Sequence, residues 1–551
     1  MKQVLQNLRT GVTEVVDVPV PAPAGEALVR TSASLVSAGT ERMLVEFAEK
    51  SLVGKVRSRP DLARQVIDKA RREGLLTTLE AAFNRLDQPM PLGYSSAGTI
   101  IALGAGMEGF QVGQRVACAG GGYAVHAEYV CVPRNLLAPL PDLLDFESAA
   151  FTTLAAIALH GFRLAQAQLG EKVAVIGLGL LGLLAVGVAR AAGCSVLGID
   201  LDPRRTALAA SLGATAVLRQ QALEANAAFA RGRGCDAVLI CADTPSGDPV
   251  ELAGQIARDR ARVVAVGAVG LQLPRKLYYE KELTFLNSRS YGPGRYDPAY
   301  EENGQDYPLG YVRWTEGRNL EACVELMASG ALPASALITH RFPVEQASQA
   351  YELITGKLQQ PFLGVLLTYP PVLESPSVEP VANQPLVPPL QPAAGPASAL
   401  DTVRLGVLGA GNFATAVLLP ALKRIDRLEL VGVVSASGAS AQHAAQRFGF
   451  RYADSQENRL LEDPQVNTLA ILTRHNLHAR QVLAGLAAGK HIFCEKPLAL
   501  NEAELAEIES ALLDPANTHL KLMVGFNRRF APLAVRLAEF LAGRSEPLVA
   551  H

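Results

Sequence analysis

Two glycine-rich turns with the same spacing, one in each half of the chain, constrain this fold more than any other feature. They read Gly177-Leu178-Gly179-Leu180-Leu181-Gly182 and Gly409-Ala410-Gly411-Asn412-Phe413-Ala414. Each follows a short strand-like run and precedes an Ala- and Leu-rich segment, which indicates a strand, a turn and a helix. In such a turn the first glycine makes the bend, the second lets a pyrophosphate approach the backbone, and the third position packs helix on strand. The sequence therefore predicts two dinucleotide-binding Rossmann domains, with an anion held at each helix N-terminus.

A third match to the same pattern, at residues 104–109, has a different context. It follows the strand-like run 99–103, but a second strand-like run over 110–116 comes next instead of a helix. We therefore predict a β-hairpin there rather than a coenzyme site.

The overall composition excludes several classes of protein. The chain has 551 residues, 49% of them hydrophobic and 19% charged, with a net charge of -2. This is typical of a soluble protein with several domains and gives no basic excess for nucleic acid. The uncharged run 173–189 contains the first glycine turn, so we interpret it as a buried strand and helix, not a membrane span. The seven cysteines include no Cys-x-x-Cys pair, which favours a reducing cytoplasm.

The pattern along the chain predicts five regions. Residues 1–145 are rich in short alternating runs, interrupted by a helical passage over 42–86, and residues 146–300 alternate strand and helix. Residues 370–401 carry many prolines and almost no charge, which predicts an extended linker. A second β-α series runs over 402–525, and residues 526–551 remain after it.

Asp200 stands at the end of the strand predicted after the first turn. A carboxylate in this position accepts hydrogen bonds from the adenosine ribose hydroxyls and repels a 2′-phosphate, so NAD is favoured at the first site. Arg204 and Arg205 lie close enough in sequence to soften that preference.

The first half resembles the medium-chain dehydrogenase/reductase family, of the alcohol and sorbitol dehydrogenase type. The motifs that carry the resemblance are Gly93-Tyr94-Ser95-Ser96-Ala97-Gly98, residues 109–116, the first glycine turn and Phe342-Pro343-Val344-Glu345-Gln346-Ala347. The resemblance implies a GroES-like β-barrel made of residues 1–145 and 301–369, with a Rossmann domain inserted at 146–300.

Zinc-dependent members of that family have a cysteine where this chain reads Ala38-Gly39-Thr40-Glu41, and Gly-His-Glu where it reads Gly93-Tyr94-Ser95. Since a catalytic zinc needs three protein ligands, we predict a first site without zinc and no metal site elsewhere. A hydrogen-bond donor must then act on the reacting oxygen. Tyr94 and Thr40 are the candidates, with Tyr94 handling the proton, although its phenol could equally pack against the barrel.

The polar segment after the last predicted strand of the first Rossmann domain is a candidate substrate loop. It contains Arg289, Tyr291 and Arg295, which suit a hydroxylated and anionic ligand such as a sugar or sugar nucleotide. Ordinary loop packing is the alternative.

The second half resembles the N-terminal Rossmann domain of the Gfo/Idh/MocA family. Its motifs are the second glycine turn, Thr473-Arg474-His475-Asn476-Leu477-His478, Gly489-Lys490-His491-Ile492-Phe493-Cys494-Glu495-Lys496-Pro497 and Gly525-Phe526-Asn527-Arg528-Arg529-Phe530. The resemblance implies that Glu495, Lys496 and Pro497 lie at the coenzyme, that Lys496 positions the reacting hydroxyl, and that His478 belongs to the catalytic set.

Two departures from the Gfo/Idh/MocA pattern leave alternatives open. Ser435 stands where many relatives have an acid, so the second site could take NAD or NADP. The substrate domain that follows in relatives is represented only by residues 526–551. Either the chain is part of a longer protein, or this domain binds coenzyme without completing a substrate pocket.

Together these features predict an NAD(P)-dependent oxidoreductase that moves hydride to or from a carbohydrate-like alcohol or ketone. The resemblance to bidomain oxidoreductases further implies surface-polysaccharide metabolism. The alternatives are a nucleotide-binding scaffold or redox sensor with little turnover, and a quinone or enoyl reductase. The expected partner is a small molecule, neither nucleic acid nor membrane, and assembly into a homo-oligomer is compatible with the sequence.

Overall fold

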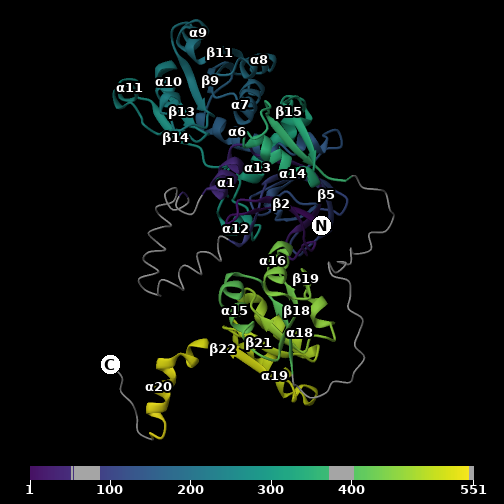
Figure 1. The fold of residues 1–551 in the computed structure, drawn as a ribbon. Helices are drawn as coiled ribbons and strands as arrows, with labels where there is room; N and C mark the ends of the chain where they lie inside the picture. Colours follow the sequence, from purple (N-terminus) through teal and green to yellow (C-terminus); the bar gives the residue numbers. More distant parts are fainter. Residues whose placement is uncertain (51–53, 55–86, 371–401, 545–551) are drawn as a thin grey trace. The chain divides into compact units, whose positions relative to one another are not determined.

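The computed structural model describes residues 1–50, 54, 87–370 and 402–544, which fall into two compact units. Residues 402–544 belong to the second unit and nearly all the others to the first (Figure 1). The predicted linker lies outside the described residues except for Pro370. The same holds for most of the helical passage predicted over 42–86, of which α1 (Thr40–Glu49) is described, and for residues 545–551.

A seven-stranded sheet forms the barrel of the first unit, in the order β15-β16-β3-β5-β6-β8 with β7 paired to β3. Its strands are β3 (Ala27–Val36), β5 (Ser95–Leu103), β6 (Arg115–Ala119), β7 (Tyr129–Val132), β8 (Leu137–Pro139), β15 (Ile338–Pro343) and β16 (Gly364–Thr368). A small sheet beside it contains β1 (Lys2–Asn7), β2 (Thr13–Asp17) and β4 (Pro89–Pro91). Because β16 pairs with β3, the chain returns to complete the barrel after the Rossmann domain.

The third glycine motif connects β5 to β6, which pair as antiparallel neighbours with Gly98 opposite Val116. The prediction of a β-hairpin at residues 104–109 is therefore confirmed.

The Rossmann domain of the first unit has a parallel sheet in the order β11-β10-β9-β12-β13-β14. Its strands are β9 (Lys172–Ile176), β10 (Ser195–Asp200), β11 (Thr215–Leu218), β12 (Cys235–Ile240), β13 (Ala257–Ala265) and β14 (Thr284–Asn287). Numbered along the chain this is the 3-2-1-4-5-6 order of a dinucleotide-binding sheet.

Helices α5 to α14 belong to the first unit. They are α5 (Phe146–Ala149), α6 (Thr152–Ala165), α7 (Leu180–Ala191), α8 (Pro203–Ser211), α9 (Ala222–Phe229), α10 (Asp248–Ile256), α11 (Arg275–Glu280), α12 (Pro298–Glu301), α13 (Glu316–Ala328) and α14 (Ala347–Ile354). Val173 and Val175 of β9 pack into one core with α7, while Ala174 and Ile176 pack into a second core on the other face. The uncharged run 173–189 is thus a buried strand and helix, as predicted. Within the described ranges, no helix is long and apolar enough to cross a membrane.

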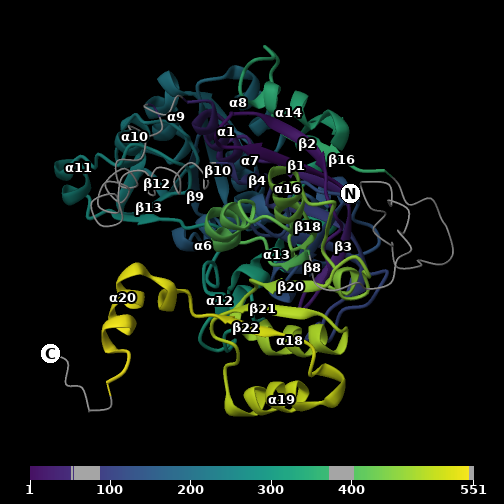
Figure 2. The same cartoon turned by 60° about the horizontal axis from the view of Figure 1, so that its bottom comes forward.

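The second unit repeats the same parallel order, β19-β18-β17-β20-β21-β22. Its strands are β17 (Val403–Leu408), β18 (Leu428–Val434), β19 (Tyr452–Asp454), β20 (Thr468–Ile471), β21 (His491–Glu495) and β22 (Leu522–Gly525). Its helices are α15 (Leu419–Leu422), α16 (Gly438–Phe448), α17 (Asn458–Leu461), α18 (His478–Ala487), α19 (Glu502–Leu513) and α20 (Pro532–Leu541). Helix α18 packs against β20 and β21, and α19 packs against the side of α18 that faces away from the sheet (Figure 2).

The helix after the second glycine turn is irregular. Residues Ala414–Leu418 form a π-helical turn before α15 begins. Pro420 explains this, because proline has no N–H to donate to the carbonyl four residues earlier and its ring crowds that carbonyl. The equivalent helix of the first unit, α7, contains no proline and is a regular α-helix.

All seven cysteines are free thiols, and six of them are buried. Burial raises the pKa of the Cys118, Cys235, Cys241 and Cys494 thiols to about 12, and the half-buried Cys131 reaches a similar value for the same reason.

Candidate active site and coenzyme sites

The first glycine turn has the geometry that a pyrophosphate needs. Gly177 has a φ of +91°, and a Cβ on Gly182 would lie 1.8 Å from the Gly177 carbonyl oxygen. Around Gly179, by contrast, a Cβ would meet nothing within 4 Å, so the backbone is open there. Leu180, Leu181 and Gly182 open α7, where N–H groups have no acceptor within the helix. The turn therefore offers free donors at a helix N-terminus, as an anion site requires.

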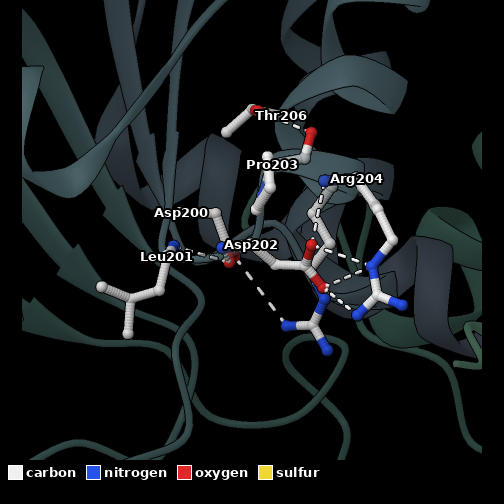
Figure 3. Close-up of polar contacts among 7 residues, drawn as sticks. Asp200, Leu201, Asp202, Pro203, Arg204 and Thr206 are labelled. Atoms are coloured by element: carbon white, nitrogen blue, oxygen red, sulfur yellow. Dashed lines mark hydrogen bonds and ion pairs between the residues drawn. The ribbon is translucent and has the colours of Figure 1, made fainter.

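Asp200, at the end of β10, binds the main chain of the coenzyme turn and that of the residues that follow it, of which Leu201 and Asp202 are shown in Figure 3. Its Oδ2 accepts from the Leu178 N–H at 2.6 Å, and its Oδ1 accepts from the N–H groups of Leu201 at 2.7 Å and Asp202 at 2.9 Å. The Arg204 guanidinium is bonded to Asp202 at 2.8 Å. Asp200 thus holds the turn in shape, and Arg204 already has a carboxylate partner.

Thr40 and Tyr94 come together in the barrel. Thr40 is exposed at the start of α1, and the Tyr94 hydroxyl donates to the Ser37 Oγ at 2.7 Å. Burial raises the pKa of Tyr94, an effect only partly offset by hydrogen bonds to the Ser37 and Thr40 hydroxyls. The phenol therefore keeps its proton at neutral pH and can serve as a hydrogen-bond donor within a cluster of three hydroxyls.

A buried polar network lies behind this cluster and was missed from the sequence. The Glu41 carboxylate, 1% exposed, accepts from the Ser37 N–H at 2.8 Å, contacts the His126 Nε2 at 3.1 Å and accepts from the Tyr351 hydroxyl. The other ring nitrogen of His126 bonds to the Ser34 Oγ at 2.7 Å. The network fixes the loop from Ser37 to Thr40, and hence the two hydroxyls that face Tyr94.

The residues at the two positions where zinc-dependent relatives have ligands do not fit a catalytic zinc. Ala38 has no ligand atom, and the Tyr94 oxygen is already bonded to Ser37. In the part of the chain that the structure describes, no group of three or more His, Cys, Asp or Glu side chains is placed to hold a metal ion.

The predicted substrate loop follows β14 at the carboxyl edge of the sheet. The guanidinium carbons of Arg289 and Arg295 lie 4.2 and 4.3 Å from the centre of the Tyr296 ring, which is 57% exposed. Tyr291 is only 2% exposed, so a direct role in binding substrate does not fit its position. The aromatic ring that the loop presents is that of Tyr296, the second tyrosine of the predicted loop.

The second glycine turn is built like the first. Gly409 has a φ of +99°, and its Cβ would lie 2.7 Å from the Leu472 carbonyl oxygen, whereas a Cβ on Gly411 would meet nothing within 4 Å. Asn412 and Phe413 are exposed and Ala414 is buried. Ser435 follows β18, at the position that Asp200 occupies in the first unit.

Glu495, Lys496 and Pro497 lie at the carboxyl end of β21. The Glu495 carboxylate accepts from the Asn527 side chain at 2.8 Å and from the Lys496 N–H at 3.2 Å, and the Lys496–Pro497 peptide bond is cis. The Lys496 side chain is exposed at this edge. The predicted position of Lys496 is therefore open to a ligand.

His478 has a different role from the predicted one. Its ring is fully buried, with Nδ1 at 2.7 Å from the Pro497 carbonyl oxygen and Nε2 at 3.1 Å from that of Thr473. Neither nitrogen faces a site where a substrate could bind. The geometry does not fit proton transfer by His478; instead, the ring ties the loops after β20 and β21 together.

Three family profiles match the chain. They are an alcohol dehydrogenase GroES-like domain at residues 68–142, a zinc-binding dehydrogenase at 181–303, and an oxidoreductase family with an NAD-binding Rossmann fold, Gfo/Idh/MocA, at 403–526. These matches follow the order of the domains seen in the structure.

Individual relatives divide in the same way. Sorbitol dehydrogenase from Bacillus subtilis is 27% identical over 301 residues, covering 48% of this chain and 78% of its own length. Myo-inositol 2-dehydrogenase from Thermotoga maritima is 33% identical over 128 residues, covering 23% of this chain and only 37% of its own length. The crystal structure of galactitol-1-phosphate dehydrogenase from Escherichia coli superposes with a TM-score of 0.51 at 23% identity, over 67% of this chain and all of that one.

The fold, the coenzyme turns and these matches define an NAD(P)-dependent oxidoreductase. More narrowly, the chain joins a medium-chain dehydrogenase/reductase module, with its GroES-like barrel, to a Rossmann domain of the Gfo/Idh/MocA family.

Proposed function

We propose that the first unit interconverts a polyol or sugar alcohol and the matching keto sugar, using NAD and no zinc. The observation that carries this proposal is the cluster of hydroxyls from Ser37, Thr40 and Tyr94 at the positions aligned with the zinc site of relatives. A nicotinamide bound at the first turn would accept or donate the hydride. The likeness to sorbitol dehydrogenase over 301 residues supports a polyol as the substrate.

The hydroxyl cluster handles the proton in this mechanism. When an alcohol is oxidised, its C–H bond breaks and the electron pair leaves with the hydride, while the O–H proton must leave separately. The Tyr94 oxygen accepts a hydrogen bond from the reacting hydroxyl, while the Tyr94 proton is donated to Ser37. The alcohol proton therefore leaves by a relay, in which Tyr94 takes it up and passes its own proton through the Ser37 and Thr40 hydroxyls to water, to which Thr40 is exposed. Glu41 and His126 keep the loop that carries Ser37 and Thr40 in place.

For the second unit we propose coenzyme binding at Gly409, Gly411 and the following helix, with NAD or NADP accepted, and Lys496 directed at the reacting group. The similarity to myo-inositol 2-dehydrogenase covers only 37% of that enzyme. The proposal that this unit performs a reaction is therefore supported by the position of Lys496 alone. A role in making surface-polysaccharide sugars, in a reducing cytoplasm, is consistent with polyol chemistry and seven free cysteines.

The test is loss of NADH absorbance when the full chain is mixed with a panel of keto sugars, after dialysis against a chelator and with zinc measured by elemental analysis. We expect turnover that survives chelation and falls in Tyr94→Phe. Stoichiometric zinc, or activity that chelation abolishes, would overturn the metal-free mechanism. Tight NADH binding with no turnover across the panel would instead favour the scaffold or sensor hypothesis.

A further inference from the structure

The loop after β14 combines an unusual backbone with an exposed charge. Ser290 and Tyr296 have φ values of +57° and +67°, a region that residues other than glycine seldom adopt, and Gly292 and Gly294 are left-handed as well. Such backbone strain persists only where the surrounding structure enforces it, and it is concentrated at ligand sites. Here it turns the Tyr296 ring outward between two guanidinium groups.

The two arginines at this ring differ in their pairing, because Arg295 forms an ion pair with Glu301. The Glu301 carboxylate accepts from Arg295 and from the Tyr296 N–H at 3.0 Å, and Asp297 accepts from the Tyr307 hydroxyl at 2.5 Å and the Ala299 N–H at 3.0 Å. Arg289 forms no ion pair with any carboxylate among the residues that the structure describes, and its contact is with the Tyr296 ring. Within the described ranges, the exposed Arg289 guanidinium is therefore bonded directly to no carboxylate.

Several buried polar atoms in and beside the loop have no hydrogen-bond partner among the residues that the structure describes. They belong to the Tyr291 hydroxyl, the Arg295 Nε and both oxygens of Glu316, whose side chain is fully buried. Burial and the nearby Glu301 charge raise the pKa of Glu316 to about 9, so at neutral pH it is protonated and does not neutralise the arginines. Glu316 therefore adds no negative charge beside the loop.

The loop also lies beside the turn that follows β6, which is bonded to the main chain of Tyr94. A Cβ on Gly121 would be 3.8 Å from the Arg295 Nη2, and the neighbouring Gly120 N–H donates to the Tyr94 carbonyl oxygen at 3.1 Å. The turn at Gly120 and Gly121 therefore contacts both the Arg295 guanidinium and the Tyr94 main chain.

We propose that Arg289, Tyr296 and Arg295 form a subsite for an oxyanion, a phosphate or a carboxylate, carried by the sugar on which the first unit acts. This inference rests on the proposed function. Guanidinium groups bind such oxyanions through two parallel hydrogen bonds. Stacking on an aromatic ring fixes the orientation of the guanidinium group without neutralising its charge. The substrate is then a sugar phosphate or a sugar acid, with the anion at this loop and the reacting carbon at Tyr94.

The full chain is titrated by calorimetry with inorganic phosphate, fructose 6-phosphate, glucuronate and neutral fructose, in the presence of oxidised NAD, which has no hydride to give to a keto sugar. We expect Arg289→Ala to weaken binding of the phosphate and carboxylate probes at least about tenfold and to leave fructose unchanged. Arg341→Ala is the matched control, because this exposed arginine of the same unit is paired with Glu147. Tyr296→Leu, which removes the stacking ring, is expected to weaken the same probes.

The only tryptophan, Trp314, provides a second signal. It lies between the guanidinium groups of Arg163 and Arg313, and the nearby Glu316 N–H bonds to the Pro293 carbonyl oxygen of the loop at 2.8 Å. Unchanged thermal unfolding of Arg289→Ala, followed by Trp314 emission, shows that the variant is folded.

The outcomes separate this subsite from the reaction. Equal affinity of Arg289→Ala and the unaltered chain for all anionic probes would overturn the subsite. Phosphate that binds at Arg289 without competing with fructose 6-phosphate would overturn its assignment to the substrate. Loss of anion binding in Arg289→Ala, with no NADH oxidation by any sugar, would support the subsite and count against the proposed function.

Discussion

The two Rossmann domains share a strand order but differ at the ends of their strands. Both turns have a left-handed first glycine against a neighbouring backbone and a second glycine with open space above it. Asp200 ends the second strand in one domain and Ser435 follows it in the other, and α7 is regular whereas Pro420 widens the equivalent helix. The coenzyme turn is thus specified by a few local steric requirements. The residues around it, which choose the coenzyme and perform the chemistry, vary independently.

Substitutions at the third turn position should show the largest difference between the domains. Gly182→Val places a side chain 1.8 Å from the Gly177 carbonyl oxygen, whereas the second domain already has Ala414 there. We expect Gly182→Val to cost at least about 3 kcal/mol and to reduce NADH stoichiometry from two to one. Calorimetric titration and thermal unfolding measure both. Ala414→Gly is the control, expected to cost about 1 kcal/mol or less. Two intact sites in Gly182→Val would contradict this comparison of the turns.

Proton transfer is expected from the first unit, so Tyr94→Phe and Lys496→Ala should behave differently. Removing the phenol hydroxyl should lower kcat for keto-sugar reduction about 10²-fold to 10⁴-fold, with a smaller change in KM. Thr40→Ala should lower kcat less than Tyr94→Phe does, because water can replace an exposed hydroxyl. Lys496→Ala should leave this reaction unchanged. If Lys496→Ala removes the activity and Tyr94→Phe does not, the roles of the two units are reversed.

Glu316 should make the stability of the first unit depend on pH. Its pKa is raised from 4.5 to about 9, so between these values the folded chain holds a proton that the unfolded chain has released. Its contribution to stability should therefore fall with rising pH by up to about 1.4 kcal/mol per unit, and level off above pH 9. Urea unfolding of the unaltered chain and of Glu316→Gln, at pH 6, 7 and 8, tests this.

The stability of Glu316→Gln relative to that of the unaltered chain should increase from pH 6 to 7 and from pH 7 to 8, because glutamine stays neutral at every pH. Glu325→Gln changes an exposed position on the same helix and is the control. Its free energy of unfolding should change with pH in the same way as that of the unaltered chain. Parallel curves for Glu316→Gln as well would mean that Glu316 is ionised in the folded state.

The smallest expected effect concerns the choice of coenzyme at the second site. Ser435→Asp places a carboxylate where Asp200 stands in the first unit, which should disfavour a 2′-phosphate. We expect NADPH affinity at this site to fall about tenfold relative to NADH. Ala436→Asp, one residue further on, is the control. An unchanged ratio in Ser435→Asp would show that the ribose lies elsewhere.

The sequence predicted features whose cause is local. Strand–turn–helix patterns gave both Rossmann domains, and the strand after residues 104–109 distinguished a hairpin from a coenzyme turn. The Glu41 network was missed because its partners His126 and Tyr351 lie 85 and 310 residues away, with no periodicity to link them. The predictions for Tyr291 and His478 failed because of burial. Both have side chains suited to a functional site, but both are packed in the interior.

The buried thiols have a practical consequence. Because their raised pKa values leave almost no thiolate at neutral pH, the native cysteines should react slowly with maleimides. A cysteine introduced on the surface of each unit would then take up dye selectively without a cysteine-free background. Energy transfer between two such dyes would then measure, in solution, whether binding of coenzyme or sugar changes the distance between the two units.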